Sequence, residues 1–223
     1  MQGPSHLLVS WYFAEAAGLE TPRERRIVAW SGLAPDIDVL AYAAALVYYR
    51  FDKDLAFENV WQVVHHRYTH GLTFVALTGI VAWLLAARSP ARARVVLLAV
   101  IASAMHNFFD VVAGGPTWPV YPYWPLSDLP VSASWSWTIA EWPNVVILLA
   151  CLAGMLLYAR IAGRSPLECF GDRADTWLAR TVRQKAAGAV SSARTRKLRW
   201  IIWAAVLLAA AAILAPLGFN PFG

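Results

Sequence analysis

Cysteine and charged residues are scarce in this sequence. Two cysteines occur in 223 residues, Cys151 inside an apolar run and Cys169 in a basic segment. Neither a disulfide framework nor a cysteine-based zinc site is therefore expected. Charged residues make up only 15% of the chain, 59% is hydrophobic, and the mean hydropathy is +0.47. Soluble domains carry more charge, so the composition predicts an all-α, polytopic membrane helical bundle with about four to six membrane-embedded segments.

A leader peptide and a nucleic-acid partner are not expected either. Residues 1–19 lack a basic start, and His6 and Glu15 interrupt their apolar character. The formal charge of +5 comes from short basic clusters beside apolar runs, which is typical of cytoplasmic loops and not of nucleic-acid binding. Twelve tryptophans and eight tyrosines suit anchoring at two membrane interfaces. The chain is therefore predicted to be a multi-pass protein of the inner (cytoplasmic) membrane, with membrane lipids as partners.

The N-terminal part is predicted to form a helical hairpin. Two apolar arms, residues 5–19 and 27–34, flank a turn that carries three arginines. A proline follows the second arm and is expected to end or kink the helix. Antiparallel folding of the two arms then returns Asp36 and Asp38 to the end where His6 lies.

A second hairpin of the same design follows. Residues 39–50 and 55–70 are predicted as short helices, and apolar runs at 72–87 and 95–113 flank another turn with three arginines. In α-helices, residues four apart share a face. Each arm of the hairpin therefore presents one polar pair at the end opposite the turn. The two pairs are His66 with His70, and His106 with Asp110. Because arginine-rich turns favour the cytoplasm, the polar ends of both hairpins are predicted to face the outer side.

The remaining chain is interpreted as loop and scaffold. Residues 114–142 hold prolines and tryptophans but no lysine or arginine, as expected of an outer loop that anchors at the interface or forms a lid or acyl-binding wall. Residues 160–199 carry ten of the nineteen basic residues and are predicted to be cytoplasmic, with part of them an amphipathic helix. The predicted divisions are a site domain (1–136), a span (137–160), a basic segment (161–199) and a final span (200–223).

Seven ionisable side chains are predicted to meet at the outer end. Such groups cost roughly 2.5–3.5 kcal/mol each within membrane helices, so their collection at one level indicates a shared role. Neutral imidazole with carboxylate suits zinc, and also manganese or iron. Seven groups are more than the ligands of one tetrahedral site. Either some of them hydrogen-bond to the ligands and orient them, or two ions bind. The predicted ligands are His6, Asp36, Asp38, His66, His70, His106 and Asp110.

Some roles stay open. The doublet His65-His66 leaves open which imidazole binds. Asp36 could be a ligand, a supporting residue or a catalytic base. Arg67 adjoins His66 and could hold a phosphate or carboxylate, so Asp36 and Arg67 are the predicted catalytic residues.

The same polar groups allow other interpretations. Considered one at a time, these residues have simpler roles. His6 could be a polar residue at the membrane–water interface, Asp36 could end a helix, and Asp110 could pair with Arg67. Together, intramembrane histidines and aspartates can relay ions or protons, but the arms between them and the basic turns are almost wholly apolar. Histidine pairs can also bind haem, which the accompanying aspartates disfavour.

Several motifs resemble one known family. The chain carries Ser-His at 5–6, Pro-Asp-Ile-Asp at 35–38, and His-Arg-Tyr-Thr-His at 66–70. His106-x-x-x-Asp110 follows, and then Gly-x-x-x-Trp-Pro. In this order they resemble the YdjM-like, LexA-regulated family of membrane-bound metal-dependent hydrolases, over about residues 5–125. The resemblance implies a metal site more than a particular substrate.

The sequence thus predicts a membrane-bound metal-dependent hydrolase with one or two divalent ions, zinc first and manganese or iron next. Such an ion lowers the pKa of its water toward ~7. A site at the outer interface among aromatic residues suits a lipid or lipid-linked substrate, with a phosphoester as the first expectation. The alternative is a non-catalytic membrane protein that uses the same cluster for ion or proton transport.

Overall fold

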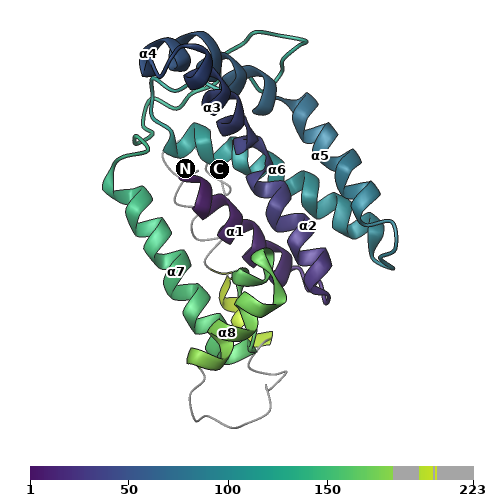
Figure 1. The fold of residues 1–223 in the computed structure, drawn as a ribbon. Helices are drawn as coiled ribbons and strands as arrows, with labels where there is room; N and C mark the ends of the chain where they lie inside the picture. Colours follow the sequence, from purple (N-terminus) through teal and green to yellow (C-terminus); the bar gives the residue numbers. More distant parts are fainter. Residues whose placement is uncertain (183–195, 203, 205–223) are drawn as a thin grey trace, which may run out of the picture.

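A bundle of helices makes up the computed structural model, which describes residues 1–182, 196–202 and 204 (Figure 1). Over these residues it contains helices and loops and no strand, which confirms the predicted all-α class. In chain order the elements are α1 (Gly3–Ala16), α2 (Pro22–Leu33), η1 (Ala34–Asp38), α3 (Val39–Tyr48), α4 (Lys53–Ala56), η2 (Phe57–Trp61), η3 (Val64–Thr69), α5 (Leu72–Leu85), α6 (Arg92–Ala113), α7 (Trp142–Ala162), η4 (Pro166–Phe170) and α8 (Asp172–Val182).

The first predicted hairpin is present as α1 and α2. Thr21 begins α2 with a capping box, in which its hydroxyl accepts a hydrogen bond from the Glu24 backbone and the Glu24 carboxylate accepts one from the Thr21 backbone. The arms approach closely at Gly32, where an added Cβ would lie 1.8 Å from Ser10 Oγ. Glycine at this position therefore lets α1 lie against the end of α2, which brings the start of α1 beside η1.

Figure 1 shows α1 and α2 between the α5–α6 pair on one side and α7 on the other. Small and branched residues make the packing tight: Ala14, Val28, Val95 and Ala99 are completely buried in one apolar cluster. Close-packed interiors of this kind hold helix ends in fixed positions, so the polar residues at those ends are placed by the bundle.

Three described helical stretches are long and apolar enough to cross a membrane, namely Pro22–Tyr48, Arg92–Ala113 and Trp142–Ala162. A fourth exists if Lys53–Thr69 and Leu72–Leu85, bent by 67°, count as one broken span. The predicted helical membrane bundle is therefore confirmed. The predicted final span at 200–217 lies almost entirely outside the described residues.

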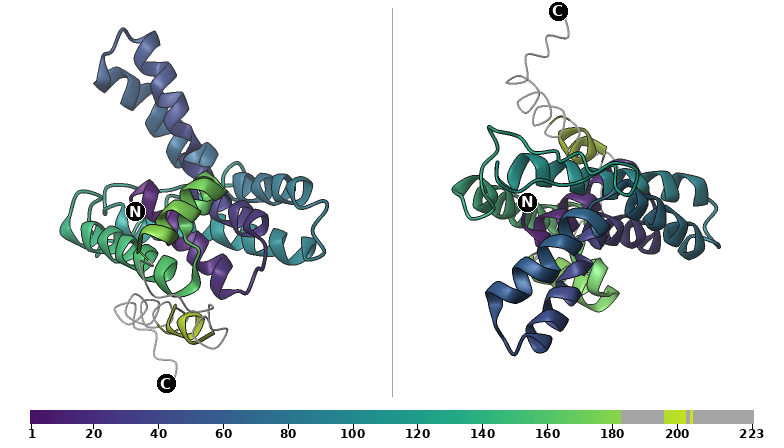
Figure 2. Two further views of the ribbon diagram at one scale, coloured as in Figure 1. Left: turned by 60° about the horizontal axis from the view of Figure 1, so that its bottom comes forward. Right: turned by 90° about the horizontal axis from the view of Figure 1, so that it is seen from above.

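An arm projects from the bundle where α3 and α4 turn back on each other (Figure 2). Its surface is apolar, since Leu40, Val47, Tyr48 and Phe51 are between 65% and 79% exposed. The arm reverses the chain between η1 and η3, and so returns the histidine segment to the aspartates of η1.

A buried ionic network closes the opposite end of the bundle. Glu15 is completely buried and accepts hydrogen bonds from Tyr158 (2.7 Å) and Arg164 (2.6 and 3.0 Å). Burial alone would raise the pKa of Glu15, but the hydrogen bonds and charge of Arg164 outweigh it and lower the pKa below 4.5. A second buried carboxylate, Glu168, accepts two hydrogen bonds from Arg25, at 2.6 and 2.8 Å. The network ties α1 and α2 to the segment after α7.

The basic segment after α7 contains the amphipathic helix that the sequence predicts. In α8, Leu178 and Ala179 are buried, whereas Trp177 is 65% exposed. Residues 183–195 of this segment lie outside the described part of the chain.

Candidate metal centre

Four side chains from three parts of the chain converge at one end of the bundle. Asp36 comes from η1, His70 from the junction of η3 and α5, and His106 and Asp110 from α6. One donor atom from each lies within 4.8 Å of the others. His70, His106 and Asp110 are buried, and the Asp36 side chain is 26% exposed. The predicted meeting of the two hairpins at a single level is thus present in the structure.

The distances between the donor atoms suit one ion. His70 Nε2 lies 3.1 Å from His106 Nε2 and 3.1 Å from Asp110 Oδ2. His106 Nε2 lies 3.2 Å from Asp110 Oδ2 and 3.5 Å from Asp36 Oδ1. Tetrahedral zinc with bonds of about 2.0–2.1 Å places its donors roughly 3.3–3.4 Å apart. Four of the six separations among these atoms are thus close to those that zinc requires, and the other two, from Asp36 to His70 and to Asp110, are within 4.8 Å.

Hydrogen bonds on the far side of each ring turn the two Nε2 atoms toward this point. His106 Nδ1 donates to the carbonyl oxygen of Gly32 at 2.8 Å. Thr69 donates its hydroxyl proton to Asp38 at 3.0 Å, so His70 Nδ1, 3.0 Å from the same hydroxyl, is the donor there. In the neutral form each ring then carries its proton on Nδ1, and the lone pairs of the two Nε2 atoms face each other. Metal-binding histidines are oriented by such partners.

His6 lies beside the four donors and supports Asp110. Its Nε2 donates to Asp110 Oδ1 at 3.1 Å, and its ring stacks on His106 with centroids 3.7 Å apart. The α-amino group of Met1 contacts the same carboxylate oxygen. Since Oδ1 is bound in this way, Oδ2 is the oxygen that faces His70 and His106. The structure places His6 where it can orient Asp110, and its role as a ligand stays a prediction.

His65, the alternative to His66 in the histidine doublet, lies beside the four donors. Its Nδ1 donates to Asp38 Oδ2 at 2.5 Å, and its ring centroid lies 4.0 Å from that of His70. Asp38, His65 and His70 form a second group of donors within 4.8 Å of one another. Of the predicted ligands, Asp38 thus belongs to a group that adjoins the first one through His70.

The prediction that His66 and His70 share a face is wrong. It assumed an α-helix, but Val64–Thr69 is a π-helix, whose hydrogen bonds join residues five apart. The wider turn aligns His65 with His70 and rotates His66 away. His66 Nδ1 contacts the Pro119 carbonyl, and its Nε2 has no hydrogen-bond partner among the described residues. The doublet in the sequence was the only signal that pointed to His65.

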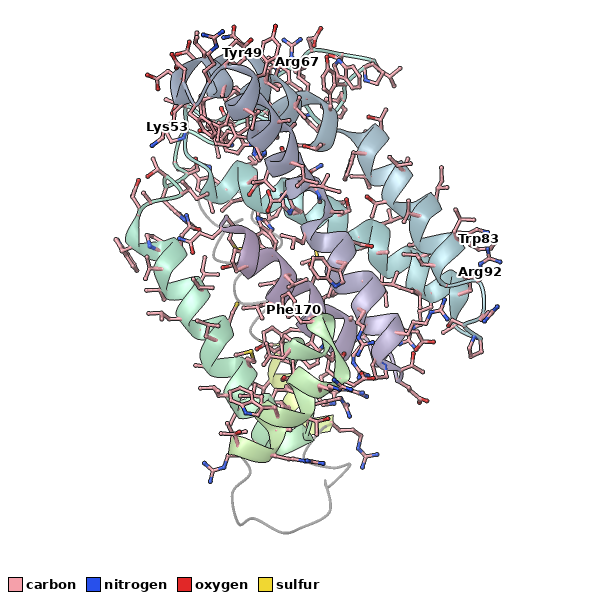
Figure 3. All side chains as sticks on the ribbon, in the orientation of Figure 1. Tyr49, Lys53, Arg67, Trp83, Arg92 and Phe170 are labelled. Carbon is pink, nitrogen blue, oxygen red and sulfur yellow. The ribbon has the colours of Figure 1, made fainter. Side chains whose placement is uncertain are left out.

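Arg67 lies outside the cluster. Its guanidinium is 3.6 Å from Asp128 and stands over the ring of Tyr121 at 4.9 Å, both in the outer loop. Figure 3 shows Arg67 at the edge of the molecule. The structure does not bring Arg67 to the four donors, and its catalytic role stays a prediction.

The loop at 114–141 covers the π-helical segment. Trp118 packs against His66 with centroids 4.3 Å apart and against His65 at 5.5 Å. The backbone of Tyr121 donates to the His66 carbonyl at 3.0 Å. The loop was predicted either to anchor at the membrane interface or to form a lid or wall at the site. The position of Trp118 is compatible with a wall.

A large cavity, lined mainly by apolar side chains, reaches the cluster. It has a volume of about 1100 Å³, and Asp36, Asp38, His65 and Asp110 contribute to its lining. The donors are therefore accessible from a space that is otherwise lined mainly by apolar side chains.

The donor set fits a divalent ion of the zinc class. Two imidazole nitrogens and two carboxylate oxygens are the ligand types that zinc, manganese and iron accept. Two lone pairs that face each other at 3.1 Å repel unless a proton or cation lies between them. The geometry does not choose among these metals.

Comparisons with known proteins agree with the resemblance seen in the sequence. A family model described as YdjM inner membrane protein matches residues 1–219. No curated protein and no solved structure matched the chain. The match confirms the family and the inner-membrane location, while regulation by LexA stays a prediction.

Proposed function

The chain belongs to the YdjM inner membrane protein family, and we propose that it is a metal-dependent hydrolase of the membrane. One observation carries the proposal: His70 Nε2 and His106 Nε2 lie 3.1 Å apart next to two carboxylates, while hydrogen-bond partners hold the Nδ1 atom on the far side of each ring. Asp36, His70, His106 and Asp110 would hold the ion.

When bound, such an ion supplies Lewis-acid chemistry, because it polarises a phosphoryl oxygen and makes water more acidic. The rest of the reaction falls to the chain's own residues. His6 and the Gly32 carbonyl fix the orientation of Asp110 and His106. Supporting partners of this kind typically change metal affinity or activity by about 10–100-fold when they are removed.

Proton transfer is assigned to the pair formed by His65 and Asp38. Asp38 accepts the Nδ1 proton of His65 at 2.5 Å, which leaves His65 Nε2 free to accept a proton from water. Asp36, on the rim of the cavity and 26% exposed, is the second candidate base if it does not bind the ion. If Asp36 acts as the base in place of His65, the rate of the reaction would differ but its products would be the same.

The proposed reaction is the hydrolysis of a phosphoester. The water oxygen forms a new bond to phosphorus, the ester P–O bond breaks, and the proton taken by the base passes to the departing alkoxide. The products are an alcohol and a phosphate. Lipid or lipid-linked substrates follow from the position of the cavity in a membrane bundle.

Relay of protons is less well supported by the same residues. On α1, His6 and Glu15 are nine residues apart, or roughly 13 Å along the helix. Between them, no carboxylate, imidazole or amine is present in the sequence of α1, and Leu7 and Leu8 face the cavity. The hydroxyl groups on α1 between them are those of Ser10 and Tyr12, and a relay would need a continuous chain of polar groups across that distance.

The proposal is tested by phosphate release from a panel of phospholipid and lipid-linked phosphoesters. Detergent-purified protein with its metal is expected to release phosphate or phosphoalcohol, and His106→Ala is expected to abolish release. Asp128→Asn removes a carboxylate from the outer loop and is the matched control, which should remain active. Equal turnover by wild type and His106→Ala would contradict the proposal.

A further inference from the structure

The cavity that reaches the cluster has a size that the proposed chemistry leaves unexplained. Its volume is about 1100 Å³, at the upper limit of small-molecule sites, which are roughly 300–1,000 Å³. The headgroup chemistry occupies only the end formed by Asp36, Asp38 and Asp110. The remaining volume must serve a different part of a ligand.

Apolar residues line the rest of the cavity. Leu7 and Leu8 come from α1, Leu33 from α2, and Leu152 and Met155 from α7. No lysine or arginine is among the described residues that line it. The cavity therefore offers a long apolar wall, which matches a hydrocarbon tail, and a mouth of aspartates, which would match an anionic head once a cation is bound between them.

The apolar part reaches α7 at Leu152 and Met155. The lining includes Ile139, just before this helix, and Met155, thirteen residues after its first residue, Trp142. This stretch of helix measures roughly 20 Å. The hydrocarbon core of a bilayer is about 30 Å thick, so one leaflet measures about 15 Å. The cavity is long enough for an acyl chain of one leaflet.

The packing of α7 against α1 leaves Leu152 and Met155 on the side of the cavity. Tyr12 donates to the Cys151 carbonyl at 2.7 Å, and its hydroxyl lies 3.0 Å from a Cβ built at Gly154. These contacts hold one face of α7 against α1, whereas Leu152 and Met155, on the adjacent face, line the cavity.

The far end of the cavity is open to the surroundings. Trp30 is 43% exposed and Phe170 is 65% exposed, and both contribute to the lining. Figure 3 shows Phe170 toward the opposite end of the bundle from Arg67. Exposed aromatic side chains beside a spanning helix contact lipid, so a hydrocarbon chain can enter sideways from the bilayer.

We propose that this cavity is an acyl-chain groove, which holds one chain of a phospholipid with its phosphate at the His/Asp cluster. The headgroup part rests on the proposed function, whereas occupancy of the groove by an acyl chain does not need hydrolysis. An ion held by the aspartates would complement an anionic phosphate, and the apolar wall accounts for the tail. The lipid is taken from the leaflet on the side of the cluster.

Photo-crosslinking in vesicles tests the groove. The full chain is placed in phosphatidylethanolamine–phosphatidylglycerol vesicles with a trace of phosphatidylglycerol that carries a diazirine midway along one acyl chain. Crosslinks are expected on α1 near Leu8 and on α7 near Met155. Met155→Trp fills the groove and should reduce these crosslinks at least fivefold. Leu156→Trp, the next residue, is 47% exposed and does not line the cavity, so it should leave them unchanged.

Each outcome decides the proposal. Equal crosslinking at Leu8 in Met155→Trp and Leu156→Trp would overturn it, as would labelling confined to outward residues of α7. Leu152→Trp repeats the test at a second lining position if Met155→Trp does not fold. Asp110→Asn should lose the metal and keep the crosslinks. Crosslinks without phosphoester hydrolysis would refute the proposed function alone, and hydrolysis that ignores acyl length and Met155→Trp would refute the groove alone.

Discussion

The rings of His65 and His70 lie with their centroids 4.0 Å apart, although five residues separate them along the chain. In an α-helix the residue four positions before His70 would share its face. The π-helix at Val64–Thr69 shifts this relation by one residue. Such insertions are frequent at functional sites, and here the shift decides which histidine of the doublet reaches the cavity.

His65→Ala and His66→Ala should therefore differ. Loss of His65 removes the partner of Asp38 and a neighbour of His70, so we expect phosphoester turnover to fall about 10–100-fold. His66→Ala should have a smaller effect on turnover, because His66 contacts Pro119 and Trp118 instead of the cluster. Turnover by the two purified variants is the measurement, and a larger loss in His66→Ala would contradict the π-helical register.

Gly32→Ala should separate α1 from α2. The new methyl group would lie 1.8 Å from Ser10 Oγ and 2.5 Å from Ser10 Cβ, and Gly32 also holds His106 through its carbonyl oxygen. Overpacking of this kind costs about 1–3 kcal/mol, so the midpoint of thermal unfolding should fall. The double variant Ser10→Gly/Gly32→Ala removes the clashing atoms and should recover much of the loss. Absence of coupling between the two changes would show that the helices do not meet here.

Glu15→Gln should destabilise the protein and change its response to acid. Glu15 is completely buried and bound by Tyr158 and Arg164, and hydrogen bonds to charged groups contribute about 1.5–3 kcal/mol each. Its pKa is lowered in the folded state, so its stabilising effect is full above pH 4.5 and is lost as the pH falls through the folded value. The midpoint temperature of thermal unfolding of the wild type should thus decrease as the pH falls below about 4.5.

The variant Glu15→Gln should be less stable than the wild type at pH 7. Its midpoint of thermal unfolding should also decrease less than that of the wild type when the pH is lowered. Glu20→Gln is the control, because the Glu20 side chain is exposed and only its backbone carbonyl binds Arg25. Unfolding curves measured in one detergent from pH 3 to 8 would compare the three proteins. Parallel curves for wild type and Glu15→Gln would show that the buried network does not depend on this carboxylate.

The arginine-rich turns of the bundle predict its orientation in the membrane, with these turns in the cytoplasm. Ala87 lies at the turn between α5 and α6, and Ser127 lies in the outer loop; both are exposed. A cysteine at position 127 should react with a membrane-impermeant thiol reagent in intact cells, and a cysteine at 87 only after the membrane is opened. The native cysteines, Cys151 and Cys169, are buried and burial raises the pKa of Cys169 to about 12, so both should react slowly. The reverse labelling pattern would place the metal centre on the cytoplasmic side.

Much of the fold was predictable, because hydrophobic runs, arginine-rich turns and a proline carry local information. The hairpins at α1–α2 and α5–α6 follow from that pattern, and with them the meeting of Asp36, His70, His106 and Asp110. Simple antiparallel return was enough to place residues distant in sequence at one end.

The exact ligand arrangement was not predictable from spacing. The π-helical register depends on tertiary contacts, such as Trp118 against the histidine doublet, which no local propensity encodes. The supporting roles of Gly32 and Thr69 depend on a carbonyl and a hydroxyl that hydrogen-bond ring nitrogens. Neither residue type signals such a role in a sequence.

The central claim is that the cluster binds a divalent ion, and elemental analysis of the detergent-purified protein tests it most directly. We expect close to one zinc, manganese or iron per chain, or two if Asp38 and His65 also bind. His106→Ala and Asp110→Asn should each lose the metal, whereas Asp128→Asn should keep it. Wild-type protein that carries no stoichiometric metal, or metal that persists in both His106→Ala and Asp110→Asn, would contradict the account.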